Sequence, residues 1–79
     1  MSKEMSGSTK RIFSIFKTAI AAEQSAQAMY KEAAGLCEDQ PLKKIFEGFY
    51  QDEKRHEQEL LNRYALLRDE YGLQTRDDG

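Results

Sequence analysis

The sequence predicts an all-α fold, in which two long helices form an antiparallel hairpin and two such hairpins associate into a four-helix bundle. Apolar residues recur at three- and four-residue steps through two segments of the chain, which is the period of an α-helix packed on one side. The only clear break, residues 38–41, is short enough to force an antiparallel connection. Charged residues make up 33% of the chain, hydrophobic ones 39%, and there is one proline, a profile typical of long amphipathic helices.

The first helix is expected from about Lys10 to Cys37. Ser8 or Thr9 can cap it, because a hydroxyl at that place can accept a hydrogen bond from a free amide of the first turn. Residues 1–9 are rich in serine and are expected to form a disordered leader. The stripe of this helix consists of Ile12, Phe13, Phe16, Ala19, Ile20, Glu23, Ala26, Gln27, Tyr30, Ala33, Ala34 and Cys37.

The second helix is expected from Pro41 to about Tyr71. Asp39 or Gln40 can cap its start, and Pro41 suits the first helical position because its missing amide proton costs nothing there. Gly72 is a natural stop. The apolar stripe of this helix consists of Leu42, Ile45, Phe46, Phe49, Leu60, Tyr64 and Leu67.

These bounds give one helical domain, residues 10–72, followed by residues 73–79, which are expected to form a flexible tail. A lone two-helix hairpin buries too little surface to be more than marginally stable. Two-fold pairing of hairpins hides the apolar stripe of each against the other. The sequence therefore predicts a homodimer or a higher oligomer built from dimers.

The charge balance and the apolar runs exclude two classes of partner. The formal net charge of −2 leaves no surplus of basic side chains to neutralise phosphates, so we expect no nucleic-acid binding. No apolar run approaches membrane-spanning or signal-peptide length, so we expect no membrane partner and a cytoplasmic location. The single cysteine, Cys37, excludes an internal disulfide and a CxxC metal site, and is expected to be a small buried residue at the end of the hairpin.

Two side chains of the second helix point to a metal site. Glu53 and His56 are three residues apart, which places both on one face of a helix, about one turn apart. They fall on the apolar stripe, where an acid and an imidazole are costly to bury unless they are paired. A carboxylate oxygen and a neutral imidazole nitrogen together suit Fe, Mn or Zn. A Glu-x-x-His pair in a charged helix is by itself more simply explained by two solvated side chains at the edge of the stripe.

Glu23 in the first helix favours the metal interpretation. It lies about 16 residues before the centre of the turn, and Glu53 and His56 lie about 14 to 17 residues after it, so at equal rise per residue all three reach the same height. Di-metal carboxylate bundles use a Glu from each of two helices and a Glu-x-x-His from each of the other two. One chain carries one of each, so two chains carry the full set.

A metal centre of this kind would link binding to assembly. Two divalent ions would neutralise the four carboxylates that two chains bring together, so metal is expected to favour dimerisation. His56 must be neutral to bind, so metal affinity is expected to fall below about pH 6.

Three further side chains near this level are candidates for a supporting role. Tyr30 could hydrogen-bond a ligand carboxylate, or it could be a core tyrosine at helical spacing. Gln27, one turn after Glu23, could orient a ligand or take a plain interface position. Glu57, next to His56, could bind an incoming ion, although a solvated position on the helix surface is the simpler interpretation.

One family shares this pattern. The spacing Glu23-x6-Tyr30, followed by Phe46-x6-Glu53-Lys54-x-His56, resembles the ferritin-like superfamily, in particular its rubrerythrin branch. The resemblance covers roughly residues 12–67. It implies that Glu23, Glu53 and His56 are iron ligands and that Tyr30 is a phenol just outside the ligand set.

The two-helix layout, with one site per pair of chains, resembles the encapsulated ferritins, which are half-bundles that assemble a ferroxidase centre between subunits. This resemblance implies two Fe ions per subunit pair, with Mn or Zn as substitutes, an encapsulin shell as a partner, and a location inside a protein nanocompartment. The sequence departs from these relatives at two points. No rubredoxin cysteines follow the hairpin, and residues 73–79 differ from the apolar peptide that docks cargo to an encapsulin shell.

The expected function is that of a ferroxidase, which oxidises Fe(II) to Fe(III) at a di-iron site between two subunits for iron storage or detoxification. Glu53 from each chain would bridge the two ions, and Glu23 and His56 would hold the outer positions. Two alternatives stay open. One is a rubrerythrin-like protein that reduces peroxide at the same site, and the other is a metal-free structural hairpin that acts as an adaptor.

Overall fold

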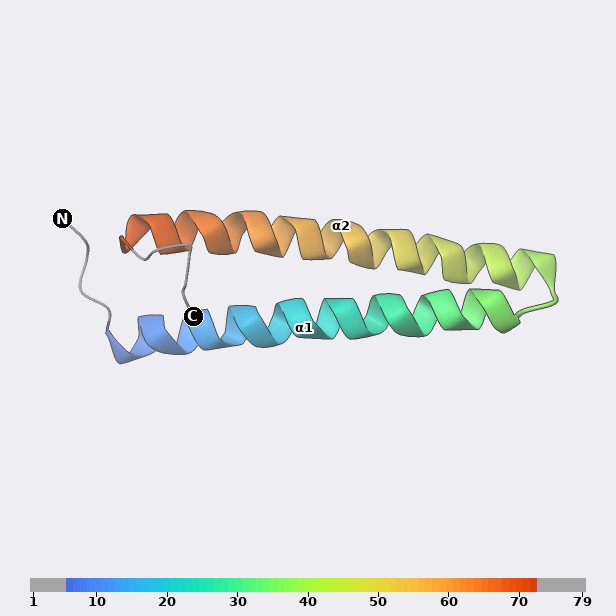
Figure 1. Cartoon of the computed structure of the whole chain (residues 1–79), viewed down its shortest axis with the longest axis horizontal. Helices are drawn as coiled ribbons and strands as arrows, with labels where there is room; N and C mark the ends of the chain where they lie inside the picture. The colour runs from blue at the N-terminus through green and yellow to red at the C-terminus, as the bar shows by residue number, and fades with distance from the viewer. Residues whose placement is uncertain (1–5, 73–79) are drawn as a thin grey trace.

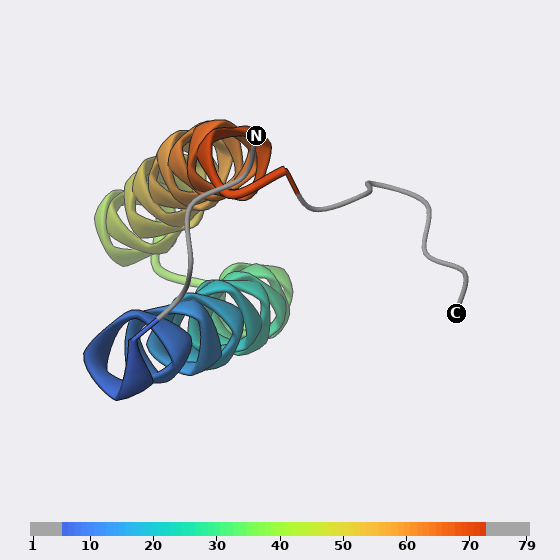
Figure 2. The same ribbon diagram turned by 90° about the vertical axis from the view of Figure 1, so that its left-hand side faces the viewer.

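The computed structural model describes residues 6–72, which form two helices and the turn between them (Figure 1). Helix α1 covers Gly7–Leu36 and helix α2 covers Gln40–Glu70. The two helices run antiparallel and lie side by side along their length, and the end-on view of Figure 2 shows no third element of the described chain against the pair. The predicted all-α hairpin is confirmed. Residues 1–5 and 73–79, which hold part of the predicted leader and the whole predicted tail, lie outside the described residues.

Helix α1 begins three residues earlier than predicted. Ser6, rather than Ser8 or Thr9, is the N-cap, and its Oγ accepts a hydrogen bond of 3.1 Å from the backbone N–H of Thr9. The Oγ of Ser6 also lies 3.1 Å from the hydroxyl oxygen of Thr9. Residues 7–9, which were assigned to the leader, are therefore helical. The prediction was wrong because three hydroxyl side chains stand within four positions, and only the backbone geometry selects among them.

The turn between the helices consists of three residues, Cys37 to Asp39. Asp39 caps α2, because its Oδ2 accepts a hydrogen bond of 2.9 Å from the backbone N–H of Leu42. Pro41 lies in the first turn of α2, where a missing N–H is not needed. Of the two predicted caps, the aspartate is the one confirmed. Cys37 is only partly buried, against the prediction, and its Sγ lies 3.6 Å from the carbonyl oxygen of Asp39.

We expect Asp39→Ala to lower the free energy of unfolding by about 1 kcal/mol, because the amide of Leu42 loses its acceptor. Asp39→Asn is the matched control, since asparagine caps a helix about as well as aspartate. Thermal unfolding followed by circular dichroism compares the two variants. Equal melting temperatures for Asp39→Ala and the wild type would show that the cap does not contribute to the start of α2.

Helix α2 ends where the glycine was expected to stop it. Tyr71 is the C-cap, and its N–H donates to the carbonyl of Leu67 at 3.2 Å. Gly72 follows with a φ of 71°, a left-handed conformation that side chains with a Cβ rarely adopt. Its N–H donates to the carbonyl of Asp69 at 3.0 Å. The predicted stop is thus confirmed in its position, and the left-handed backbone of Gly72 explains it.

The residues through which α1 and α2 contact each other follow at alternating steps of three and four, and we call them the seam. All of them are buried or partly buried, which is the pattern of a two-stranded antiparallel coiled coil. The seam of α1 consists of Thr9, Phe13, Phe16, Ile20, Glu23, Gln27, Tyr30, Ala34 and Cys37, and that of α2 of Lys43, Phe46, Tyr50, Glu53, Glu57, Leu60, Tyr64, Leu67 and Tyr71.

Aromatic rings fill the seam on both sides of its middle. Toward the chain ends, the ring of Phe13 lies 5.8 Å from that of Tyr64 and 5.9 Å from that of Tyr71, both in edge-to-face arrangements. Toward the turn, the ring of Tyr30 lies 6.3 Å from that of Phe46. Among the described residues only Phe13 and Ala34 are buried, at 8% and 7% exposure. The hairpin alone therefore leaves much of its apolar surface in water.

The residues that directly precede seam positions form a second stripe on each helix, which we call the open flank. On α1 every one after Ser8 in the first turn is apolar: Ile12, Ile15, Ala19, Ala22, Ala26, Met29, Ala33 and Leu36. On α2 the apolar members lie mainly near the turn and include Leu42, Ile45 and Phe49, which are 42%, 50% and 44% exposed.

Within residues 6–72, neither helix has a stretch both long and apolar enough to cross a membrane.

Both open flanks lie on one side of the hairpin. On the other side, one shared recess is lined by residues that directly follow seam positions. Among them are Lys31 and Gly35 of α1 and Glu47 and Gln51 of α2. In an antiparallel pair, the residues that precede the seam must then share the opposite side. The single apolar stripe predicted for each helix is thus two stripes, one packed between the helices and one exposed.

Candidate metal centre

The middle of the seam is polar, in contrast to its aromatic ends. The central seam positions are Glu23 and Gln27 on α1 and Glu53 and Glu57 on α2, where a plain coiled coil would carry aliphatic side chains. Both helices continue without a break through this region, so helical spacing fixes the position of each side chain.

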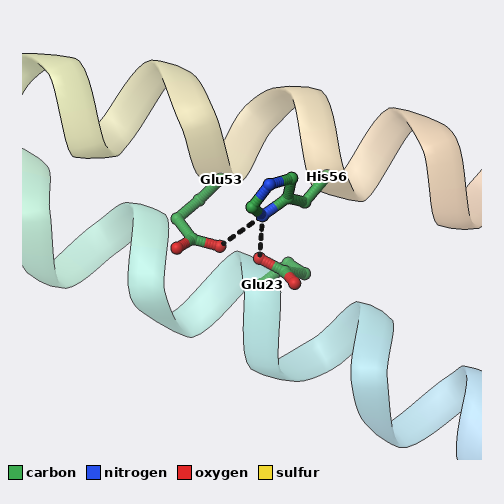
Figure 3. Close-up of side chains that lie close together, drawn as sticks. All are labelled: Glu23, Glu53 and His56. Atoms are coloured by element: carbon green, nitrogen blue, oxygen red, sulfur yellow. Dashed lines mark ion pairs between the residues drawn. The ribbon is translucent and has the colours of Figure 1, made fainter.

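The structure brings the three predicted ligands together (Figure 3). The Nδ1 atom of His56 lies 3.4 Å from Oε1 of Glu53 and 3.8 Å from Oε1 of Glu23. One donor atom from each of the three side chains lies within 4.8 Å of the other two. The expectation that these residues reach the same height on either side of the turn is confirmed. Their role as metal ligands stays a prediction.

The burial of the group suits a bound cation. The side chains of Glu23 and Glu53 are each 23% exposed, and that of His56 is 47% exposed. Among the described residues, Oε1 of Glu23 is a buried oxygen without a hydrogen-bond partner. A buried carboxylate oxygen is costly in that state, and a positive ion beside it would remove the cost. Two carboxylates and an imidazole are a donor set that suits iron and other first-row metals.

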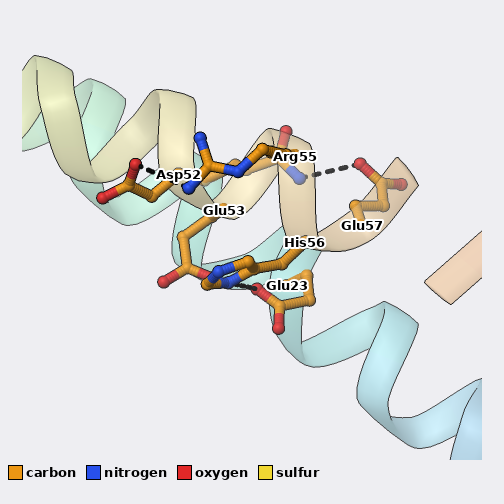
Figure 4. Close-up of polar contacts among 7 residues, drawn as sticks. Glu23, Asp52, Glu53, Arg55, His56 and Glu57 are labelled. Carbon is orange, nitrogen blue, oxygen red and sulfur yellow. Dashed lines mark hydrogen bonds and ion pairs between the residues drawn. The ribbon is translucent and has the colours of Figure 1, made fainter. Parts of the chain in front are cut away.

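The basic side chains that stand between Glu53 and His56 in the sequence are engaged elsewhere. Arg55 Nη2 lies 3.3 Å from Oδ1 of Asp52, on an exposed part of α2 (Figure 4). Lys54 Nζ lies 5.6 Å from the ring centre of Tyr50. Neither contact neutralises the two carboxylates of the group, so the site keeps its negative charge for a metal.

One further carboxylate in the polar layer has partners that the sequence did not reveal. Oε2 of Glu57 accepts a hydrogen bond of 2.7 Å from Nε2 of Gln24, and its Oε1 accepts one of 2.7 Å from Nε2 of Gln27. The interpretation of Glu57 as a freely solvated side chain is therefore wrong. Residue spacing alone does not pair these two side chains, because in an antiparallel hairpin Gln27 lies one helical turn nearer the connection than Glu23, whereas Glu57 lies one turn farther from it than Glu53. The signal that could have found the contact is the tilt of helical side chains toward the N-terminus of their own helix, which brings both to the level of the group.

The two glutamines also change the acidity of Glu57. Hydrogen bonds from Gln27 and then Gln24 stabilise the ionised carboxylate and hold its pKa below its ordinary value of 4.5, while partial desolvation opposes them and Lys54 adds a small favourable charge. Because the pKa of Glu57 is lower in the folded chain than in the unfolded chain, ionised Glu57 stabilises the fold at any pH above the ordinary carboxyl pKa. This contribution to the free energy of unfolding is lost as the pH falls through the lowered folded-state pKa.

We therefore expect acid to destabilise the wild type more steeply than a Glu57→Gln variant, because the variant has no carboxylate to protonate. The comparison is made on metal-free protein, by thermal unfolding at a series of pH values from neutral to below 4.5. Parallel losses of stability in the two proteins would contradict the assignment of these hydrogen bonds.

Tyr30 lies on the same helix as Glu23 but about 10 Å further along its axis. Its ring is 5.2 Å from that of Phe49, and the two rings belong to the aromatic layer on the turn side of the candidate site. Among the described residues, the hydroxyl of Tyr30 makes no hydrogen bond to the carboxylates of the group. The supporting role of Tyr30 beside the ligands therefore stays a prediction. The structure shows its ring packed against that of Phe49.

A single chain carries half of the donor set of a di-metal carboxylate centre. It offers two carboxylates and one imidazole from one side, whereas a di-metal carboxylate centre uses four carboxylates and two imidazoles. His56 belongs to the open flank, so the group opens on the same side of the hairpin as the exposed apolar residues.

Comparison with known proteins adds a family. The family model named Rubrerythrin matches residues 14–78, a range that includes all three residues of the candidate centre. The comparisons with curated proteins and with solved structures gave no match.

Proposed function

Because this chain belongs to the rubrerythrin family, within the ferritin-like superfamily, we propose that it is a ferroxidase-type protein whose di-iron centre is completed by a second copy of the chain. Membership of this family indicates a ferritin-like di-iron protein with redox activity. The observation that carries the proposal is the grouping of Glu23, Glu53 and His56 around the unpartnered buried oxygen of Glu23.

The roles of the three residues follow from their chemistry. The carboxylates of Glu23 and Glu53 supply negative charge and hard oxygen donors to a divalent ion. The Nδ1 atom of His56, which faces both carboxylates, supplies the nitrogen donor when the ring is neutral. Iron bound there would supply the redox chemistry, in which Fe(II) gives an electron to dioxygen or peroxide and Fe(III) is the product.

Three observations support completion of the centre by a second chain. The exposed imidazole of His56 leaves the group open on one side. After Ser8 in the first turn, the open flank of α1 is apolar at every position, which is the property of a helix face that packs against another helix. Finally, the four carboxylates of two chains carry a charge that two divalent ions neutralise. The expected assembly is a homodimer, or an oligomer built from dimers, with a four-helix bundle at each metal centre.

The test adds Fe(II) to metal-free protein under nitrogen and then admits air or hydrogen peroxide. We expect near-ultraviolet ferric absorption that saturates at two irons per pair of chains. Faster oxidation by peroxide than by oxygen would identify the peroxide-reducing alternative. The absence of ferric absorption above a protein-free control would remove both redox functions.

The mass of the native assembly, measured with and without Fe(II), tests whether a second chain completes the metal centre. We expect Fe(II) to shift the population toward pairs of chains, because the metal binds only to the paired state in this proposal. Stoichiometric metal binding by a chain that stays monomeric would contradict the shared centre. Assembly that is unaffected by Fe(II), and unaffected or improved by Glu23→Ala, would instead favour the metal-free adaptor.

A further inference from the structure

We propose that Gln24 and Gln27 are positioning residues that hold Glu57 outside the metal-binding group. Each chain then offers two carboxylates and one imidazole to the metal, instead of three carboxylates and one imidazole. This inference deepens the proposed function and rests on it. It assigns a role to a contact that lies beside the candidate ligands and shares no residue with them.

Helical spacing alone would place Glu57 within reach of the site. It follows Glu53 by four residues and His56 by one, and residues four apart lie on the same face of a helix. Glu57 is also a seam position, so its side chain starts between the two helices at the level of the group. A glutamate with three rotatable bonds in that place is a natural additional ligand unless something directs it elsewhere.

The two glutamines direct it elsewhere. Both oxygens of Glu57 are occupied at 2.7 Å, one by each amide. Gln24 directly follows the seam residue Glu23, so it lies on the side of the hairpin opposite the open flank and His56. Figure 4 shows the Glu57 carboxylate directed away from the His56 ring and from the Glu23 and Glu53 carboxylates.

The choice of amide side chains fits this role. Two glutamines satisfy a carboxylate without adding net charge near the neighbouring group. A lysine in place of Gln27 could also pair with Glu57, but it would bring a positive charge within about one turn of Glu23 and would oppose a bound cation. With Glu57 held aside, two chains present four carboxylates, which match the charge of two divalent ions. With Glu57 released, they would present six.

The experiment uses Co(II), whose visible absorption reports coordination number, as a probe of the chain of residues 1–79. The double variant Gln24→Ala/Gln27→Leu removes both donors. We expect it to bind Co(II) about tenfold more tightly than the wild type, with a weaker visible band, because an added carboxylate raises the coordination number. Adding Glu57→Leu to the double variant should restore the wild-type band and affinity, which a general loosening of the helices would not predict.

Two comparisons complete the test. Glu57→Gln alone should keep the wild-type Co(II) spectrum, because this side chain is not a ligand while the glutamines hold it. This variant decides the matter even if the double variant does not fold, since a changed spectrum would overturn the proposal. Gln58→Ala, which breaks an exposed hydrogen bond of 3.1 Å to Asn62 within α2, is the matched control and should leave the spectrum unchanged.

The outcomes separate the two proposals. Co(II) binding by the wild type together with an unchanged spectrum in the double variant would overturn the positioning role and leave the proposed function standing. A shifted spectrum that Glu57→Leu fails to restore would also overturn it. If the wild type does not bind Co(II) or Fe(II), the proposed function fails and this inference falls with it.

Discussion

His56→Ala and Glu53→Ala are each expected to lower the rate of Fe(II) oxidation more than about 100-fold, since changes to groups that only support metal ligands already cost 10–100-fold. Each substitution removes one of the three donors that a chain would contribute to the proposed centre. A symmetric centre loses two donors at once, because both chains carry the change. The measurement is stopped-flow absorption of the ferric product after Fe(II) and oxygen are mixed with metal-free protein.

Glu47→Ala is the matched control for this prediction. It removes an exposed carboxylate from the same helix, on the side of the hairpin away from His56, and should leave the rate within about twofold of the wild type, because an exposed charge acts only weakly through water. Circular dichroism must show that the ligand variants remain helical. An oxidation rate that survives in a folded His56→Ala or Glu53→Ala protein would exclude this group as the site of the reaction.

Phe13→Ala is expected to lower the free energy of unfolding by about 3 kcal/mol, at the lower end of the range for removal of a buried aromatic ring. Phe13 is one of two buried residues in the described chain and packs edge-to-face on Tyr64 and Tyr71. A protein of this length has a total stability of about 4–12 kcal/mol, so the loss is a large share of the whole. Urea unfolding of metal-free protein at one fixed concentration measures it.

Leu61→Ala is the control for the packing prediction. Leu61 is 39% exposed and directly follows the seam residue Leu60, which places it on the side of the hairpin away from the open flank, so its removal should lower the free energy of unfolding by about 1 kcal/mol or less. If both variants lost the same stability, the aromatic contacts between α1 and α2 would not be what holds the hairpin together.

Much of the fold follows from local chemistry that the sequence already contains. The three- and four-residue periods determine two helices, Asp39 and Pro41 determine where the second begins, and Gly72 determines where it ends. The family match bears out the resemblance to the rubrerythrin branch that the Glu23, Glu53 and His56 spacing suggested. The narrower resemblance to encapsulated ferritins, with the encapsulin shell and the nanocompartment, stays a prediction.

The rise of 1.5 Å per residue explains why the site could be located from the sequence. Two helices that leave one short turn must pass each other at equal heights, so counting outward from the turn pairs Glu23 with Glu53 and His56. No knowledge of side-chain packing enters that count. The structure accordingly places the three residues where the count puts them.

The rotation of each helix about its own axis could not be predicted by counting residues from the turn. The apolar stripes were wide enough for either edge to pack inward, and only contact between the helices decides which edge does. That contact puts Phe13 and Phe46 in the seam and leaves Ile12 and Ile45 in water.

The same rotation decides the surroundings of the candidate centre. It leaves His56 on the exposed side of the hairpin, and it brings Gln24 and Gln27 within hydrogen-bond distance of Glu57. The sequence by itself thus determined which residues share a level, because height along a helix depends on residue number alone. Only the tertiary structure decided which way each one faces, because helix rotation is set by the sum of many contacts between two surfaces.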